Sequence, residues 1–135
     1  MDITKFRTNK VAERNGVWVE FKDGDGRAEF LIASTLSPEY RKVFNEEIEA
    51  VRRDKPKPTD EDFDAADCRV YARAILLGWR GVTAGTEDLA YSVQAATDIL
   101  LNAPAVRNFV RAYAQSEYNF RESRLAEAKA VLGKS

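Results

Sequence analysis

Residues 16–34 have the sequence GVWVEFKDGDGRAEFLIAS, and this stretch predicts a β-hairpin. Both halves are rich in β-branched and aromatic residues, which favour strands. The Asp-Gly-Asp-Gly segment between them, residues 23–26, is typical of a tight turn. Because Trp18 alternates only loosely with polar neighbours, the pattern leaves the strand register open.

Downstream of the hairpin, apolar residues recur at helical spacing. Ser37 is a candidate N-cap and Pro38 suits the first helical position, whereas Pro56 and Pro58 end the first helix. Helices are expected over residues 38–53, 59–77, 88–102 and 104–120. The predicted fold class is therefore mainly α: a small helical domain of about four helices with an N-terminal β-hairpin.

The sequence divides into three parts. Residues 1–15 are polar and mildly basic, so we expect a flexible N-terminal arm. Residues 16–120 form a single domain, and residues 121–135 are expected to be a charged helical C-terminal tail. The predicted core is drawn from the apolar faces of the helices, namely Tyr40, Phe44, Cys68, Ile75, Trp79, Val106 and Phe109.

Composition argues against catalysis. The 135 residues include no histidine, which removes the commonest general base and the commonest metal ligand. The single cysteine, Cys68, lies on an apolar helical face with Ala72 and Ile75, so we expect a buried, unreactive thiol. The acidic run at residues 60–67 suits a helix start, and residues 23–34 fail the calcium-loop pattern. We expect no enzyme activity, no catalytic residue, no metal and no cofactor.

Charge and hydropathy limit the partners and the location. There are 21 Lys and Arg against 22 Asp and Glu, and this balance disfavours a dedicated nucleic-acid binder. No uncharged apolar run approaches the roughly 20 residues of a membrane span. Residues 1–5 show no apolar signal core, so we expect a cytoplasmic protein without a membrane partner.

The order of several motifs resembles the tail assembly chaperones of long-tailed, lambda-like bacteriophages and their prophages. The resemblance covers about residues 16–130. Ser37 stands where that family tends to carry Asn, and residues 83–86 are irregular. The motifs follow the hairpin in the order Ser37-Pro38-Glu39-Tyr40, Gly78-Trp79-Arg80-Gly81-Val82, Tyr91-Ser92, Leu100-Leu101, Phe109, Ala114 and Phe120-Arg121.

This resemblance implies a non-catalytic role in the bacterial host cytoplasm. Such chaperones bind the tape measure protein, keep it soluble, and are absent from the mature virion. Many are also made in a longer, frameshifted form whose extension recruits the tail tube protein. The end of the sequence, Leu132-Gly133-Lys134-Ser135, permits a slippery heptamer over codons 132–134.

Two sets of residues are candidates for contacts with other chains. Tyr113, Tyr118, Phe120 and Leu125 are the candidate partner-binding residues. Their spacing places them off a single helical stripe, so at least one is expected to be exposed. Because hairpin edges invite pairing with another chain, we also expect a homo-oligomer, a ring or a spiral. Its candidate contact residues are Trp18, Phe21 and Phe30.

A different function stays open at this point. A small phage or bacterial regulatory protein would bind nucleic acid through a basic C-terminal helix interleaved with aromatic residues. The basic residues of this segment are Arg107, Arg111, Arg121, Arg124, Lys129 and Lys134. A steep salt dependence of DNA binding would favour this alternative, and co-purification with a long helical protein would favour the chaperone.

Overall fold

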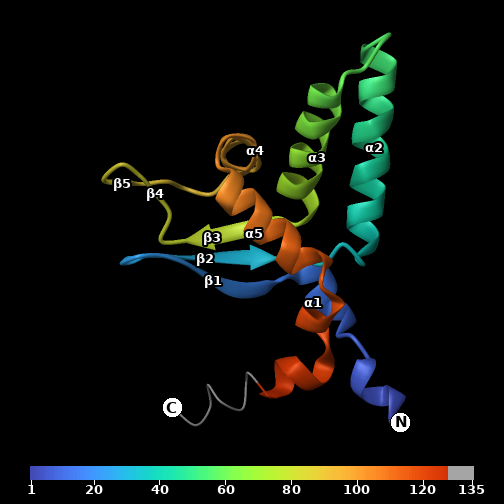
Figure 1. Cartoon of the computed structure of the whole chain (residues 1–135), viewed down its shortest axis with the longest axis vertical. Coiled ribbons are helices and arrows are strands. Elements are labelled where there is room, and N and C mark those ends of the chain that lie inside the picture. Colours follow the sequence, from blue (N-terminus) through green and yellow to red (C-terminus); the bar gives the residue numbers. More distant parts are fainter. Residues whose placement is uncertain (128–135) are drawn as a thin grey trace.

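A three-stranded antiparallel sheet lies at the centre of the computed structural model, which describes residues 1–127 (Figure 1). Its strand order is β1-β2-β3, and a separate two-stranded ribbon joins β4 to β5. The strands are β1 (Val17–Asp23), β2 (Gly26–Ile32), β3 (Leu76–Arg80), β4 (Thr83–Ala84) and β5 (Glu87–Asp88). The helices are η1 (Ile3–Phe6), α1 (Lys10–Asn15), α2 (Pro38–Asp54), α3 (Asp60–Ala74), α4 (Val93–Asn102), α5 (Pro104–Gln115) and η2 (Glu117–Phe120).

The hairpin agrees with the sequence prediction, and the structure fixes its register. Val17 faces Ile32 and Asp23 faces Gly26 across a two-residue turn. Gly24 has φ +57°, a value that favours glycine at the first position of such a turn. Side chains therefore alternate between an inner face, which α5 covers, and an outer face, which carries Trp18.

The mainly-α prediction is wrong, because the segment assigned to the end of the second helix is a strand. Helix α3 stops at Ala74, and Leu76–Arg80 pair with β2 as the third strand. Trp79 lies opposite Phe30 in this ladder. The spacing of Cys68, Ile75 and Trp79 suits a helical face, but pairing with a distant strand overrides this local pattern.

Residues 1–15, expected as a flexible arm, contain η1 and α1. The Asn9 side chain caps α1, and the backbone N–H of Asn9 donates to the carbonyl oxygen of Phe120 at 2.7 Å. The N–H of Glu122 donates to the carbonyl oxygen of Arg7 at 2.9 Å. We call this pairing of residues 7–9 with residues 120–122 the terminal clasp. Residues 122–127 are helical, and the rest of the predicted tail, residues 128–135, lies outside the described residues.

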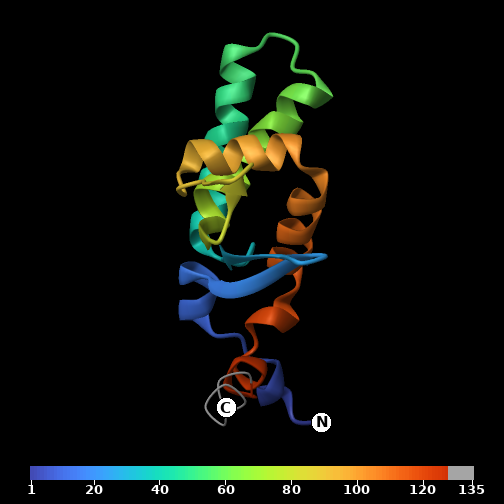
Figure 2. The same ribbon diagram turned by 90° about the vertical axis from the view of Figure 1, so that its left-hand side faces the viewer.

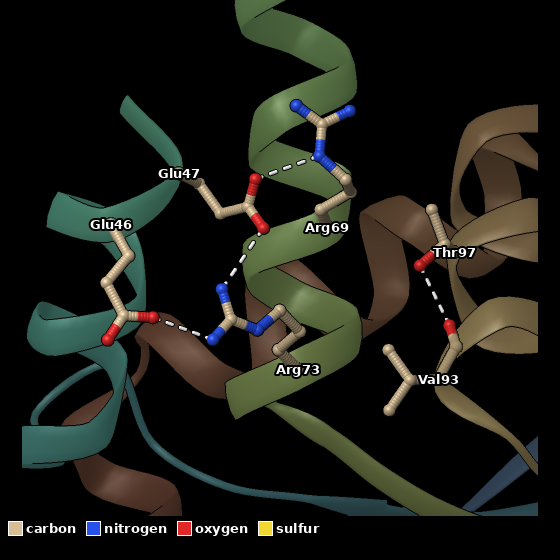
Figure 3. A network of polar contacts seen from close by, with 6 residues as sticks. All are labelled: Glu46, Glu47, Arg69, Arg73, Val93 and Thr97. Atoms are coloured by element: carbon tan, nitrogen blue, oxygen red, sulfur yellow. Dashed lines mark hydrogen bonds and ion pairs between the residues drawn. The ribbon is translucent and has the colours of Figure 1, made fainter. Parts of the chain in front are cut away.

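Helices α2 and α3 form an antiparallel pair that projects from the sheet, at the end opposite η1 and residues 122–127 (Figures 1 and 2). Thr59 and Asp62 form a reciprocal capping box at the start of α3. Glu47 of α2 accepts hydrogen bonds from Arg69 at 2.9 Å and from Arg73 at 3.1 Å (Figure 3). These charged contacts fix α2 against α3.

The core lies between the inner face of the sheet and helices α3, α4 and α5. Cys68, Ile75 and Trp79 are buried as expected. Tyr40, Val106 and Phe109 are half-buried and pack against the core, whereas Phe44 is 38% exposed, so its assignment to the core is wrong.

Candidate functional site: an apolar groove

An open groove of about 400 Å³ lies beside the hairpin turn, between the sheet, the segment after β3 and the junction of α4 with α5. We call it the apolar groove. Asp23 and Arg27, which bear opposite charges, stand among its lining residues. Its apolar lining consists of Phe21, Ala28, Phe30, Val82, Ile99, Ala103 and Val106.

Aromatic packing supports the groove lining from the core side, where Phe21 and Phe30 of the lining contact Phe109. The rings of Phe21 and Phe109 meet edge to face with centroids 5.0 Å apart, and Phe30 lies 5.7 Å from Phe21. Phe30 is buried on the central strand β2. Because these rings support one another, the groove is formed before any partner arrives.

Two backbone features shape the sides of the groove. Gly81 has φ +72°, and a Cβ there would lie 3.2 Å from the carbonyl oxygen of Arg27, so only glycine lets the chain pass β2 this closely. The carbonyl of Val82 accepts a hydrogen bond of 2.9 Å from Leu89. Pro104 begins α5 directly after Ala103. These features fix the backbone next to Val82 and Ala103, which both line the groove.

The groove offers apolar surface rather than reactive groups. Within residues 1–127, no cluster of three or more His, Cys, Asp or Glu side chains is placed to hold a metal ion. Cys68 is buried away from the groove lining, and burial raises the pKa of its thiol. The Arg107 guanidinium donates a hydrogen bond of 3.7 Å to the Cys68 sulfur, and this bond lowers the pKa of the thiol, which partly offsets the effect of burial. The arrangement is suited to burying apolar side chains of a partner.

The four candidate partner-binding residues do not form one surface. Tyr118 is 54% exposed, which agrees with the expectation that at least one of them is exposed. Phe120 is completely buried, and the half-buried Tyr113 packs edge to face on it at 5.8 Å. Phe120 therefore belongs to the core, because η2 turns its ring inward below α5. Leu125 is half-buried in the helical segment after the terminal clasp.

The candidate oligomer residues lie on two faces of the sheet. Trp18 is on the outer face, where the guanidinium of Arg80 lies 3.7 Å from its ring. Phe21 is half-buried on the inner face and lines the groove. Phe30, on the central strand, is buried within the chain itself and offers no exposed contact. Of the three, only Phe21 is on the edge strand β1 with its side chain on the inner face and only half-buried.

The basic side chains of α5 are neutralised by neighbours. Arg107 pairs with Asp64 at 3.0 Å, and Arg111 pairs with Asp67, both on α3. Burial raises the pKa of Asp67 despite the opposing attraction of Arg111. Arg121 pairs with Glu117 and stacks on Phe6. These three pairings reduce the unpaired positive charge of the candidate basic segment, whereas Lys129 and Lys134 lie outside the described residues.

Sequence reasoning missed most of the groove. Val106 is among the predicted core residues, and Val82 belongs to a motif of the resemblance, but neither Val82 nor Ile99 is a predicted site residue. The predicted helix over residues 59–77 runs into the first two residues of β3 and so conceals the third strand. The local signal for this strand is weak, because only Ile75 and Trp79 favour strands here, whereas Leu76 and Leu77 also suit a helix.

In the part of the chain that the structure describes, no helix has the length and apolar character to cross a membrane.

Comparison with known protein families gives a match. A family model described as YdaY prophage protein matches residues 36–131, which is more than two thirds of the chain. The match runs from the residues before α2 past η2 and omits the hairpin. No curated protein and no solved structure gives a significant match.

Proposed function

Because the chain belongs to the YdaY prophage protein family, it is a phage or prophage protein, and we propose that it acts as a tail assembly chaperone for the tape measure protein. The family match agrees with the phage origin that the motif order implied. The apolar groove and the order of motifs support the finer assignment.

A tape measure protein is a long helical chain that must stay soluble until tube subunits enclose it. A chaperone for such a chain needs an apolar surface that accepts one face of a helix. The apolar groove has this character, with an aromatic base and charges of both signs beside it. Because one small groove binds weakly, several copies would coat the chain and still be released. Binding only the unassembled chain keeps it soluble by mass action.

The observation that carries the proposal is the preformed apolar base of the groove. Phe21 and Phe109 are already packed at 5.0 Å, so little ordering of the chaperone is needed when a helix binds. The proposed contacts are made by Phe21, Val82, Ile99 and Val106, whose side chains are half-buried and line the groove.

Co-expression with the tape measure protein of the same prophage tests this proposal. The wild-type chain is expected to raise the amount of soluble tape measure protein and to co-purify with it. Ile99→Asp, which places a charge in the groove, should reduce the affinity about tenfold or more. Leu101→Asp is the matched control, because Leu101 is exposed on the same helix and does not line the groove.

Both variants must retain the wild-type circular dichroism spectrum and melting temperature within a few degrees. The proposal is wrong if the wild-type chain leaves the tape measure protein insoluble. It is also wrong if correctly folded Ile99→Asp binds as well as the Leu101→Asp control.

The proposal includes a longer, frameshifted form that recruits the tail tube protein. The slippery heptamer is expected over codons 132–134, which encode residues outside the described part of the chain. Reading the nucleotide sequence, and searching for a longer minor product by mass spectrometry, tests this element separately. Mass spectrometry of purified particles tests the expected absence of the chaperone from the mature virion.

The nucleic-acid alternative has less support. Arg107, Arg111 and Arg121 each pair with a carboxylate of the chain, which reduces the positive charge available to phosphates. DNA binding that weakens steeply with salt, together with no effect on tape measure solubility, would reverse this preference.

A further inference from the structure

Strand β1 is an edge strand with one unpaired side. The two-residue turn makes Asp23 and Gly26 a hydrogen-bonded pair, so alternation directs the N–H and C=O groups of Trp18, Glu20 and Lys22 away from β2. Within residues 1–127, the backbone of β1 makes no hydrogen bond to any segment other than β2. Figure 1 shows β1 at the border of the sheet, with α1 near its first residues. This edge is a template for another strand.

On its outer face, this edge strand carries one negative and one positive side chain. Glu20 and Lys22 lie on the outer face, both more than one third exposed, with 3.5 Å between Lys22 Nζ and Glu20 Oε1. On the inner face, Phe21 is half-buried between the edge and the apolar groove. A partner strand would therefore meet a charged face on one side and an aromatic ring on the other.

We propose that β1 pairs antiparallel with β1 of a second copy of this chain, about a two-fold axis at Phe21. The two sheets then form one continuous sheet of six strands. Glu20 of each copy lies opposite Lys22 of the other, and the two Phe21 rings face each other on the inner face.

Charge and space select this register. An axis at Glu20 would place two carboxylates opposite each other, which is unfavourable. An axis at Val19 would leave Glu20 opposite Trp18 and bring α1 toward the turn of the other copy. With the axis at Phe21, Val19 lies opposite Asp23, so α1 projects beyond that turn. Only this register places unlike charges opposite each other twice.

The two-fold contact also positions the apolar grooves. An axis perpendicular to the sheet keeps both inner faces on the same side, so the two grooves lie next to each other across the Phe21 pair. Because such a contact is isologous, it closes at two copies and does not propagate into a ring. Dimerisation does not require the tape measure protein, so it stands or falls separately from the proposed function.

Sedimentation equilibrium of the full chain tests the dimer, and charge reversal tests the register. We expect a reversible dimer in which Glu20→Lys and Lys22→Glu each raise the dissociation constant about tenfold, because each change places like charges opposite each other twice. The double variant carrying both changes should recover the wild-type value. Glu49→Lys is the control, because Glu49 is exposed on α2, which projects from the sheet away from β1.

A second variant tests the backbone contact. The N–H of Glu20 points away from β2, so Glu20→Pro removes no hydrogen bond of the isolated chain and should abolish the dimer. Circular dichroism checks that this variant is folded. A wild-type chain that is monomeric at all concentrations overturns the proposal, as does a dimer that persists in folded Glu20→Pro. Failure of the double charge variant to recover association also overturns it.

Discussion

The indole N–H of Trp79 in β3 donates a hydrogen bond of 2.8 Å to the carbonyl oxygen of Leu89. The Trp79 ring also packs edge to face on Tyr91 at 5.1 Å, and the Tyr91 hydroxyl donates to the carbonyl oxygen of Leu76 at 2.7 Å. Trp79 therefore ties the third strand to the segment that leads into α4, and this connection holds one side of the apolar groove in place.

Replacement of this indole should lower stability. Trp79→Phe removes the donor to Leu89 and leaves unfilled space in the core, so we expect a loss of about 2 to 3 kcal/mol in the free energy of unfolding. Urea denaturation measures it. Trp18→Phe is the control, because Trp18 is 39% exposed on the outer face, and it should cost less than about 1 kcal/mol. Equal losses would contradict the role assigned to the Leu89 contact.

Phe120 and Tyr118 should respond in opposite ways. Phe120→Ala empties a completely buried site below α5, so we expect a loss of about 3 to 5 kcal/mol in stability. Tyr118→Ala, at a position 54% exposed, should cost less than about 1 kcal/mol. Thermal and urea melts compare the two. A stable Phe120→Ala variant would show that the ring is not part of the core.

Stability should fall in alkali because of Tyr71. Burial raises the pKa of the Tyr71 phenol from 10 to about 12, although a hydrogen bond from Gln115 opposes this effect. The folded state therefore keeps the phenol neutral, while the unfolded state releases the proton above pH 10. The contribution, about 2 to 3 kcal/mol, is present below pH 10 and is lost as the pH rises to 12.

Tyr71→Phe should flatten this part of the stability profile. Denaturation at several pH values between 9 and 12 measures how the free energy of unfolding changes with pH. The slope of the variant should be smaller by the contribution of about one proton, the one that Tyr71 releases on unfolding. An unchanged slope would mean that other tyrosines account for the alkaline loss.

The charged contact between α2 and α3 gives a further test. The side chain of Glu47 is 14% exposed and accepts from both Arg69 and Arg73, so Glu47→Gln should cost about 1 kcal/mol at low salt. Asp54→Asn removes an exposed carboxylate that pairs with Arg53, its neighbour in sequence, and should leave stability unchanged. The difference between the two variants should shrink in 1 M NaCl, because the Debye length is then only about 3 Å and the charges are screened. Equal effects would argue that Glu47 acts as an ordinary surface charge.

Local chemistry predicted the elements whose signals are short-range. The Asp-Gly turn, the Ser37 cap with Pro38, and the Pro104 start are visible in the sequence and hold in the structure. Strand β3 was missed because its partner, β2, lies more than 40 residues earlier. The ordered structure of residues 1–15 was missed for the same reason, because Asn9 hydrogen-bonds to Phe120, which is distant in the sequence.

The candidate site was less predictable than the fold. The absence of histidine and the apolar face around Cys68 can be seen in the sequence, and they direct attention away from catalysis. The groove depends on Phe21 of β1, Val82 of the loop after β3 and Ile99 of α4, and only the folded chain brings these three segments together. Spacing alone placed Phe120 on a surface, but the turn after α5 rotates it inward.

The terminal clasp has a consequence for synthesis on the ribosome. Residues 7–9 emerge early, but their backbone partners at residues 120–122 are translated more than 100 residues later. At about 5 to 20 residues per second, the early segment waits several seconds without its native contacts. The hairpin, which needs only residues 17–32, can form long before that. Within residues 1–127, the clasp therefore closes only after almost all of the described chain has been translated.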